Sequence, residues 1–139
     1  MTTLNPKTTV LVIDDEEAIL DFMSSMLLQA GYNVIVACNG KAAMQKLESV
    51  TADIVITDLI MPEKEGIETM KEIQSLYPAC GIIAMSGSIF GSVYLSMAKQ
   101  LGAKKILKKP FKKQELLDSI EEILTAKESD LSQNDSDGK

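Results

Sequence analysis

The sequence predicts an α/β fold in which helices cover both faces of a parallel β-sheet. Five short apolar runs rich in β-branched residues alternate with longer segments in which apolar residues recur at helical spacing. The runs contain few polar residues, which is typical of strands buried on both faces. A helix between two strands returns the chain to the end of the sheet where the previous strand began, in a right-handed crossover. We therefore expect the strands to be parallel.

The first half of the chain is predicted to contain three strands and two helices. After the first apolar run, Ile19, Met23 and Leu27 share one face of a helix that Gly31 ends. A shorter helix directs Met44 and Leu47 inward. In chain order, these elements are a strand over 10–13, a helix over 18–30, a strand over 34–37, a helix over 41–49 and a strand over 54–57.

The second half continues the same alternation. Pro62 and Gly66 mark a loop, after which Ile67 and Ile73 belong to a helical repeat that Pro78 stops. The predicted elements are a helix over 67–77, a strand over 82–85, a helix over 91–101, a strand over 105–108 and a helix over 111–126.

Length and composition indicate one domain followed by a polar tail. A chain of 139 residues lies in the usual size range of a single domain. Beyond the last predicted helix, Leu131 is the one large apolar residue among Ser, Asp, Asn, Gln and Gly, a composition typical of disorder. We therefore predict a domain over 8–126 and a disordered polar tail over 127–139.

The composition argues against several functional classes. The chain has no histidine, which excludes a histidine-based catalyst or phosphodonor. Its formal net charge is −6 and its basic residues are all lysine, so direct binding of nucleic acid is not expected. The longest apolar run, 34–38, is far shorter than the ~20 residues of a membrane span, and the first residues lack a signal-peptide core. We expect a cytoplasmic protein in which Cys38 and Cys80 are reduced and structural.

Polar residues gather where four predicted strands end. Asp14 and Asp15 follow the first strand, Asp58 the third, Ser86 the fourth and Lys109 the fifth. The carboxyl ends of parallel strands meet at one edge of the sheet, where open α/β sheets bind their ligands. The acidic run at 14–17 could also serve only as a helix N-terminus, but that interpretation leaves Asp58 unexplained.

Three clustered aspartates require positive charge among them, because they otherwise repel one another. Oxygen ligands that leave room for water suit Mg²⁺. The formal charges of three aspartates, one Mg²⁺ and one lysine sum to zero, and such a site can accept a phosphoryl group. A carboxylate nucleophile would then form an aspartyl phosphate.

These motifs resemble those of response regulator receiver domains, the phosphoacceptor modules of two-component signalling. The resemblance covers roughly residues 8 to 126. It implies a flavodoxin-like (βα)5 fold, a doubly wound parallel sheet with strand order 2-1-3-4-5. The segments that carry it are LVIDDE at 11–16, ITDLIMP at 56–62 with Gly66, MSG at 85–87 and LKKPF at 107–111.

The resemblance also implies how Mg²⁺ would be bound. Asp15 would bind the ion directly, and Asp14 would act mainly through a metal-bound water. Asp58 and the backbone carbonyl of Ile60 would complete the protein ligands.

The resemblance further implies that Asp58 is phosphorylated by a partner's phosphohistidine, on a sensor histidine kinase or a histidine phosphotransfer protein. Ser86 would hydrogen-bond the phosphoryl group and Lys109 would pair with it. The Lys109–Pro110 peptide bond is a candidate for the cis form. One position departs from the family pattern, because Ile106 stands where a Tyr or Phe usually rotates inward on activation. We therefore expect switching to act through Ser86 and the loop that follows it.

These observations predict a stand-alone receiver that acts as a signalling module and catalyses only its own phosphorylation and dephosphorylation. Alternatives are a receiver fragment of a larger response regulator or hybrid kinase, a binding module that is never phosphorylated, and a Mg²⁺-dependent phosphohydrolase that uses an aspartyl phosphate. The last usually needs a second Asp two positions after the nucleophile, where this chain has Ile60.

A lysine-rich segment offers a possible docking surface. Residues 99–113 contain seven lysines and no acid. Such a run is usually a solvated face. In receivers, however, the surface of the fourth helix, fifth strand and fifth helix commonly meets partners, so a downstream protein could dock there.

Overall fold

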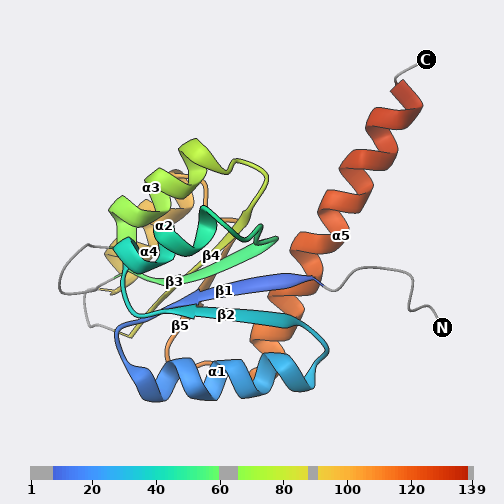
Figure 1. Cartoon of the computed structure of the whole chain (residues 1–139). Coiled ribbons are helices and arrows are strands. Elements are labelled where there is room, and N and C mark those ends of the chain that lie inside the picture. The colour runs from blue at the N-terminus through green and yellow to red at the C-terminus, as the bar shows by residue number, and fades with distance from the viewer. Residues whose placement is uncertain (1–7, 60–65, 88–90, 138–139) are drawn as a thin grey trace.

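The computed structural model describes residues 8–59, 66–87 and 91–137. A five-stranded sheet lies between two helical layers, with α2, α3 and α4 on one face and α1 and α5 on the other (Figure 1). The strands are β1 (Thr9–Ile13), β2 (Asn33–Ala37), β3 (Ile54–Asp58), β4 (Gly81–Ser86) and β5 (Lys105–Lys108). The helices are α1 (Glu17–Gln29), α2 (Gly40–Leu47), α3 (Gly66–Leu76), α4 (Gly91–Gln100) and α5 (Lys113–Asp137).

All strand pairs are parallel and the strand order is β2-β1-β3-β4-β5, which confirms the predicted flavodoxin-like fold. Strand β3 lies at the centre of the sheet, and β1 lies between β2 and β3. Ile13 is in register with Thr57, so the residues that follow them leave the sheet side by side. This register brings Asp14 and Asp58 to the same edge.

Two hydrophobic layers cover the sheet because its strands are apolar on both faces. Leu11 and Val55 belong to the layer beneath α2, α3 and α4, and Val12 and Ile56 to the layer beneath α1 and α5. All four side chains are fully buried. Burying an aliphatic side chain of this size contributes about 1.5 to 3 kcal/mol to the stability of the fold. The well-packed strands β1 and β3 therefore hold the aspartates at their carboxyl ends in fixed positions.

Helix α5 is longer than the sequence predicts. The composition predicted a disordered tail over 127–139, but the backbone is helical as far as Asp137. Figure 1 shows the C-terminal part of this helix leaving the body of the molecule. The segment 127–137 contains no Gly or Pro, so the polar composition gives no signal that would break the helix. Among the helices of the described residues, none combines the length and apolar character that a membrane crossing needs.

Candidate functional site

The carboxyl ends of β1 and β3 bring three aspartates together. One carboxylate oxygen from each of Asp14, Asp15 and Asp58 lies within 4.8 Å of the other two. Asp14 and Asp58 are buried, whereas Asp15 is exposed. The carboxylate of Asp14 also accepts the backbone N–H of Glu16 at 2.9 Å, just before α1 begins. The structure therefore contains the predicted cluster, in which two carboxylates are buried and the third is accessible to water.

Lys109 enters the cluster from the end of β5. Its Nζ donates to Asp14 Oδ2 at 2.8 Å and to Asp58 Oδ2 at 2.9 Å. A third carboxylate, that of Glu16, has its Oε1 at 3.9 Å from the same nitrogen. The peptide bond between Lys109 and Pro110 is cis, as the resemblance implied.

The ammonium of Lys109 is held in its charged form. Burial by itself lowers the pKa of this amine, but the hydrogen bonds that Lys109 donates to Asp14 and Asp58, together with the negative charges of these carboxylates, outweigh that effect and raise the pKa above its usual value. Three carboxylates and one ammonium leave a formal charge of −2. An oxygen-only site with this charge suits a hard divalent cation, since Mg²⁺ prefers carboxylate oxygens and water.

Two glycines allow the backbone and the lysine to approach so closely. A Cβ on Gly66, the first residue of α3, would lie 2.1 Å from the carbonyl oxygen of Asp58. A Cβ on Gly87 would lie 3.1 Å from Cβ of Lys109. The sequence singled out both positions within motifs, but only the coordinates show what each glycine makes room for.

Ser86 occupies the same edge. It is buried at the end of β4, where it is in register with Lys108 of β5, and the preceding Met85 is in register with Asp58. Its position between β3 and β5 is the one the sequence predicted. The predicted carbonyl ligand from Ile60 lies outside the described residues.

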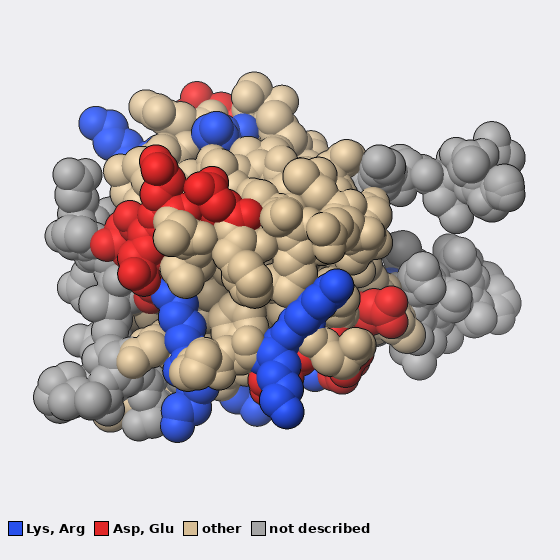
Figure 2. Space-filling view, turned by 90° about the horizontal axis from the view of Figure 1, so that it is seen from below, with Lys and Arg blue, Asp and Glu red and all other residues tan. Residues whose placement is uncertain are grey.

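An apolar hollow beside the cluster was not found from the sequence. Phe22 on α1 is 61% exposed and helps to line a cavity of about 340 Å³ together with Ile19, Pro110 and Phe111. Lys109 lines it too, so the hollow adjoins the carboxylates. Acidic side chains gather at one end of the face that α1 covers (Figure 2). The sequence did contain a signal for this exposed ring. Phe22 is adjacent to the buried Met23, so helical spacing places it outside the face of α1 that packs on the sheet.

The lysine-rich segment is partly engaged in pairs. Lys105 forms an ion pair with Glu122 of α5, and Lys109 belongs to the aspartate cluster. The side chains of Lys99 and Lys112 are exposed. Along α4 and the residue after it, three large apolar side chains at helical spacing are also exposed: Val93 at 59%, Met97 at 42% and Leu101 at 38%.

Comparison with protein families identifies the constellation. The family model described as the response regulator receiver domain matches residues 10–121. This match includes the three aspartates, Ser86 and Lys109.

Individual proteins agree with the family model. The chain is 31% identical over 122 residues to the alkaline phosphatase synthesis transcriptional regulatory protein PhoP of Bacillus subtilis (strain 168), covering 86% of this chain and 49% of that protein. It is 33% identical over 116 residues to the transcriptional regulatory protein CpxR of Klebsiella pneumoniae, covering 83% and 48%. The chain thus spans about half the length of the curated relatives it matches.

Solved structures extend the similarity to the whole fold. The crystal structure of a CheY-like response regulator receiver domain protein from Methanospirillum hungatei JF-1 superposes with a TM-score of 0.82 at 28% sequence identity. The match covers 90% of this chain and 99% of that one.

Proposed function

The chain belongs to the response regulator receiver domain family, and on this premise we propose that it accepts a phosphoryl group on Asp58 and thereby changes its binding to partner proteins. One observation carries the proposal, namely the single ammonium of Lys109 that hydrogen-bonds both Asp14 and Asp58. A phosphoryl group on Asp58 would place negative oxygens beside that ammonium, where charge-assisted hydrogen bonds are strongest. The buried hydroxyl of Ser86 lies at the same edge and would serve as a further donor.

The donor would be a phosphohistidine of another protein, because this chain has no histidine. A carboxylate oxygen of Asp58 attacks the phosphorus atom, and an O–P bond forms as the P–N bond breaks. The electron pair of the broken bond stays on the imidazole nitrogen, which takes up a proton. Lys109 stabilises the charge on the phosphoryl oxygens during this transfer.

Asp14, Asp15 and Asp58 would hold Mg²⁺, with the carbonyl of Ile60 as a further ligand. When bound, the ion neutralises charge on the phosphoryl oxygens. The fit depends on the donor set, since three carboxylate oxygens lie within 4.8 Å of one another and their excess charge beside Lys109 is −2. Asp15 is the exposed member and is therefore the one that water and an ion can reach first.

The phosphodonor protein would dock on the hollow lined by Phe22. The exposed phenyl ring, Ile19 and Phe111 offer an apolar contact adjacent to Lys109, so a histidine presented by a docked helix or loop could reach Asp58. Such a partner is a sensor histidine kinase or a histidine phosphotransfer protein. The protein is then a signalling module in the cytoplasm and has no small-molecule substrate to turn over.

A downstream partner would use a different face. Val93, Met97 and Leu101 form an exposed apolar stripe with exposed Lys99 beside it, a combination that suits an acidic protein surface with an apolar centre. Lys99→Glu combined with Met97→Glu should weaken binding of a downstream partner, and unchanged binding would remove this assignment.

The alternative functions predict different amounts of phosphate released or bound per chain, or a different length of the encoded protein. Incubation with a small phosphodonor and Mg²⁺ should add one phosphoryl group per chain, and peptide mass spectrometry should map that group to Asp58. Continued hydrolysis of a phosphate ester beyond one equivalent would instead indicate a phosphohydrolase. A receiver within a longer regulator would show the same uptake, and the reading frame of its gene distinguishes it from a stand-alone receiver.

A further inference from the structure

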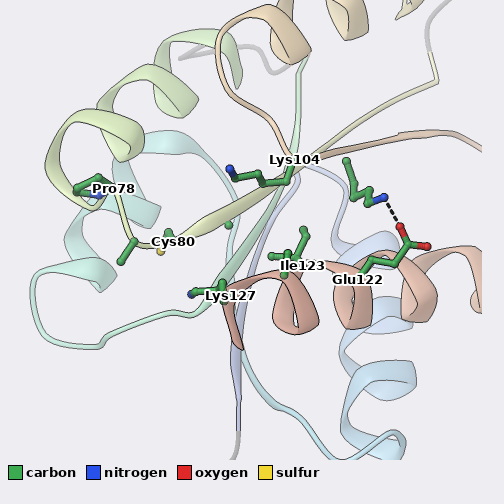
Figure 3. A pocket seen from close by; sticks show the side chains of 10 residues that line it. Pro78, Cys80, Lys104, Glu122, Ile123 and Lys127 are labelled. Atoms are coloured by element: carbon green, nitrogen blue, oxygen red, sulfur yellow. Dashed lines mark hydrogen bonds and ion pairs between the residues drawn. The ribbon is translucent and has the colours of Figure 1, made fainter. Parts of the chain in front are cut away.

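A second cavity, of about 800 Å³, lies at the amino-terminal ends of β4 and β5. The aspartates lie at the opposite, carboxyl-terminal ends of the strands. The cavity is formed by the loop before β4, the start of β5 and the part of α5 near residue 126 (Figure 3). Its volume is in the range of pockets that bind small organic molecules. None of the residues assigned to phosphoryl transfer lines it.

The inner surface of this cavity is mainly apolar. Pro78, Ile123 and Ala126 line it, and Ile123 is itself part of the core beneath α5. Gly81 gives that isoleucine its position, because a Cβ on Gly81 would lie 2.6 Å from Cγ2 of Ile123. A ligand that enters would therefore meet a fixed hydrocarbon surface.

The charged residues around this surface are unequal in sign. Lys105 pairs with Glu122, which neutralises the one carboxylate of the lining. Within the part of the chain that the structure describes, neither Lys104 nor Lys127 takes part in an ion pair. Figure 3 shows both lysine side chains extending toward the Pro78–Cys80 side of the cavity, that of Lys104 from the residue before β5 and that of Lys127 from α5. Two positive charges thus face an apolar surface.

We propose that this cavity binds a small organic anion with an apolar body, of the class of acyl or aryl carboxylates. The carboxylate would lie on the Pro78–Cys80 side of the cavity, where the ammonium groups of Lys104 and Lys127 would attract it and donate charge-assisted hydrogen bonds. The apolar body would lie against Ile123 and Ala126. This site is independent of the function proposed for Asp58.

Cys80 provides a built-in reporter of occupancy. Its thiol lines the cavity and donates a hydrogen bond to the carbonyl oxygen of Ala52 at 2.8 Å. Burial raises the pKa of this thiol; the nearby Lys127 lowers it and Asp53 raises it. Cys38 is exposed and follows the carboxyl end of β2, whereas Cys80 precedes the amino end of β4. Cys38 is thus remote from the cavity and serves as an internal reference.

The experiment measures alkylation of both cysteines by iodoacetamide, a neutral reagent, with peptide mass spectrometry as the readout. Phenylbutyrate and octanoate are the probes, at about 10 mM because ligands of this size bind in the millimolar range or tighter. At saturation either probe should slow alkylation of Cys80 about five-fold or more and leave Cys38 unchanged, since the bound fraction follows mass action. Phenylbutanol, which has the same apolar body without the charge, should have little effect.

Matched variants separate the site from general lysine effects. Lys104→Gln combined with Lys127→Gln should abolish protection of Cys80, compared with and without probe in the same variant. Lys41→Gln combined with Lys113→Gln, at exposed positions outside the cavity, should retain it. The proposal is overturned if neither carboxylate protects Cys80, if phenylbutanol protects it equally, if Cys38 is protected to the same extent, or if the first double variant keeps full protection.

Discussion

The ammonium of Lys109 and the carboxylates around it set the charge balance of the aspartate cluster. A buried carboxylate is costly unless it is paired, and Asp14 is fully buried. Lys109 pairs with it and with Asp58, but one cation cannot balance three aspartates. We expect the remaining negative charge to destabilise the protein when no divalent cation is bound, and the proposed Mg²⁺ would offset it.

Asp15→Asn tests this balance. Removing the exposed carboxylate of the cluster relieves repulsion, so the melting temperature in metal-free buffer should rise by roughly 3 °C. Added Mg²⁺ should stabilise the parent protein and have little effect on the variant, because a ligand has been lost. Thermal unfolding followed by circular dichroism, with and without Mg²⁺, gives both values. A variant that Mg²⁺ stabilises as much as the parent would argue against Asp15 as a ligand.

Most of the site could be predicted at the level of residues because its members follow strands. Asp14, Asp58, Ser86 and Lys109 each stand directly after or at the end of an apolar run, and parallel strands bring such positions together. Phe22 escaped prediction for a different reason. Its place off the inward face of α1 follows from the helical spacing, but whether another segment covers the ring depends on tertiary packing, which the sequence does not show.

At the scale of single elements, α3 begins in close contact with the end of β3. The backbone N–H of Gly66 donates to the carbonyl of Leu59 at 3.0 Å, and a Cβ at this position would overlap the carbonyl oxygen of Asp58. A glycine at the start of α3 is therefore what allows this helix to begin so close to the end of β3.

Gly66→Ala should lower the free energy of unfolding by at least about 2 kcal/mol, because the new methyl group can be accommodated only by moving backbone. Gly31→Ala is the contrast. No atom lies within 4 Å of its added Cβ, and its cost should be limited to about 1 kcal/mol from its positive φ. Denaturant titration measures both. Equal losses in the two variants would contradict the steric explanation for Gly66.

Strand β5 carries the departure from the family pattern. Ile106 is half-buried, packs against the core layer beneath α2, α3 and α4, and is in register with Ala84. A branched aliphatic side chain is stiff about χ1 and has no ring to rotate inward.

Addition of beryllofluoride with Mg²⁺, as a mimic of the phosphoryl group, should therefore shift amide resonances mainly around Ser86 and Gly87, with modest changes along β5. Two-dimensional NMR of the labelled protein measures this. Ile106→Tyr supplies the missing ring and should enlarge the changes along β5. If the parent already shows its largest changes centred on Ile106, switching does not act mainly through Ser86 and the loop that follows it.

Helix α5 shows where composition alone misleads. Low apolar content predicts that a segment buries little apolar surface. It does not predict whether the backbone of that segment is helical or disordered. The buried positions described in this helix end at Ile123, yet the helix continues to Asp137. The prediction of a disordered tail was therefore wrong for the backbone of 127–137, and the end of the folded domain near residue 126 stays a prediction.

For the molecule as a whole, the fold was predictable because each strand is a short apolar run and each helix is amphipathic. The strand order came from the resemblance, since periodicity does not specify which strands are neighbours. The cavity beside Cys80 could not be predicted, because it depends on how three separate segments meet at the edge of the sheet.

A chain that ends after Lys127 tests the proposed domain boundary. It lacks only the polar continuation of α5 and the last two residues, so its melting temperature should stay within about 2 °C of the parent value. Its uptake of a phosphoryl group should also be unchanged. Failure to fold, or a large loss of stability, would place residues beyond 127 within the folded domain.

Phosphoryl uptake by matched aspartate variants tests the central proposal most directly. The parent protein, Asp58→Asn and Asp21→Asn, an exposed position on α1, are incubated with a small phosphodonor and Mg²⁺, and their intact masses are measured. The parent and Asp21→Asn should each gain one phosphoryl group, which peptide mapping places on Asp58, and Asp58→Asn should gain none. If Asp58→Asn takes up as much phosphoryl group as the parent, Asp58 is not the phosphoacceptor.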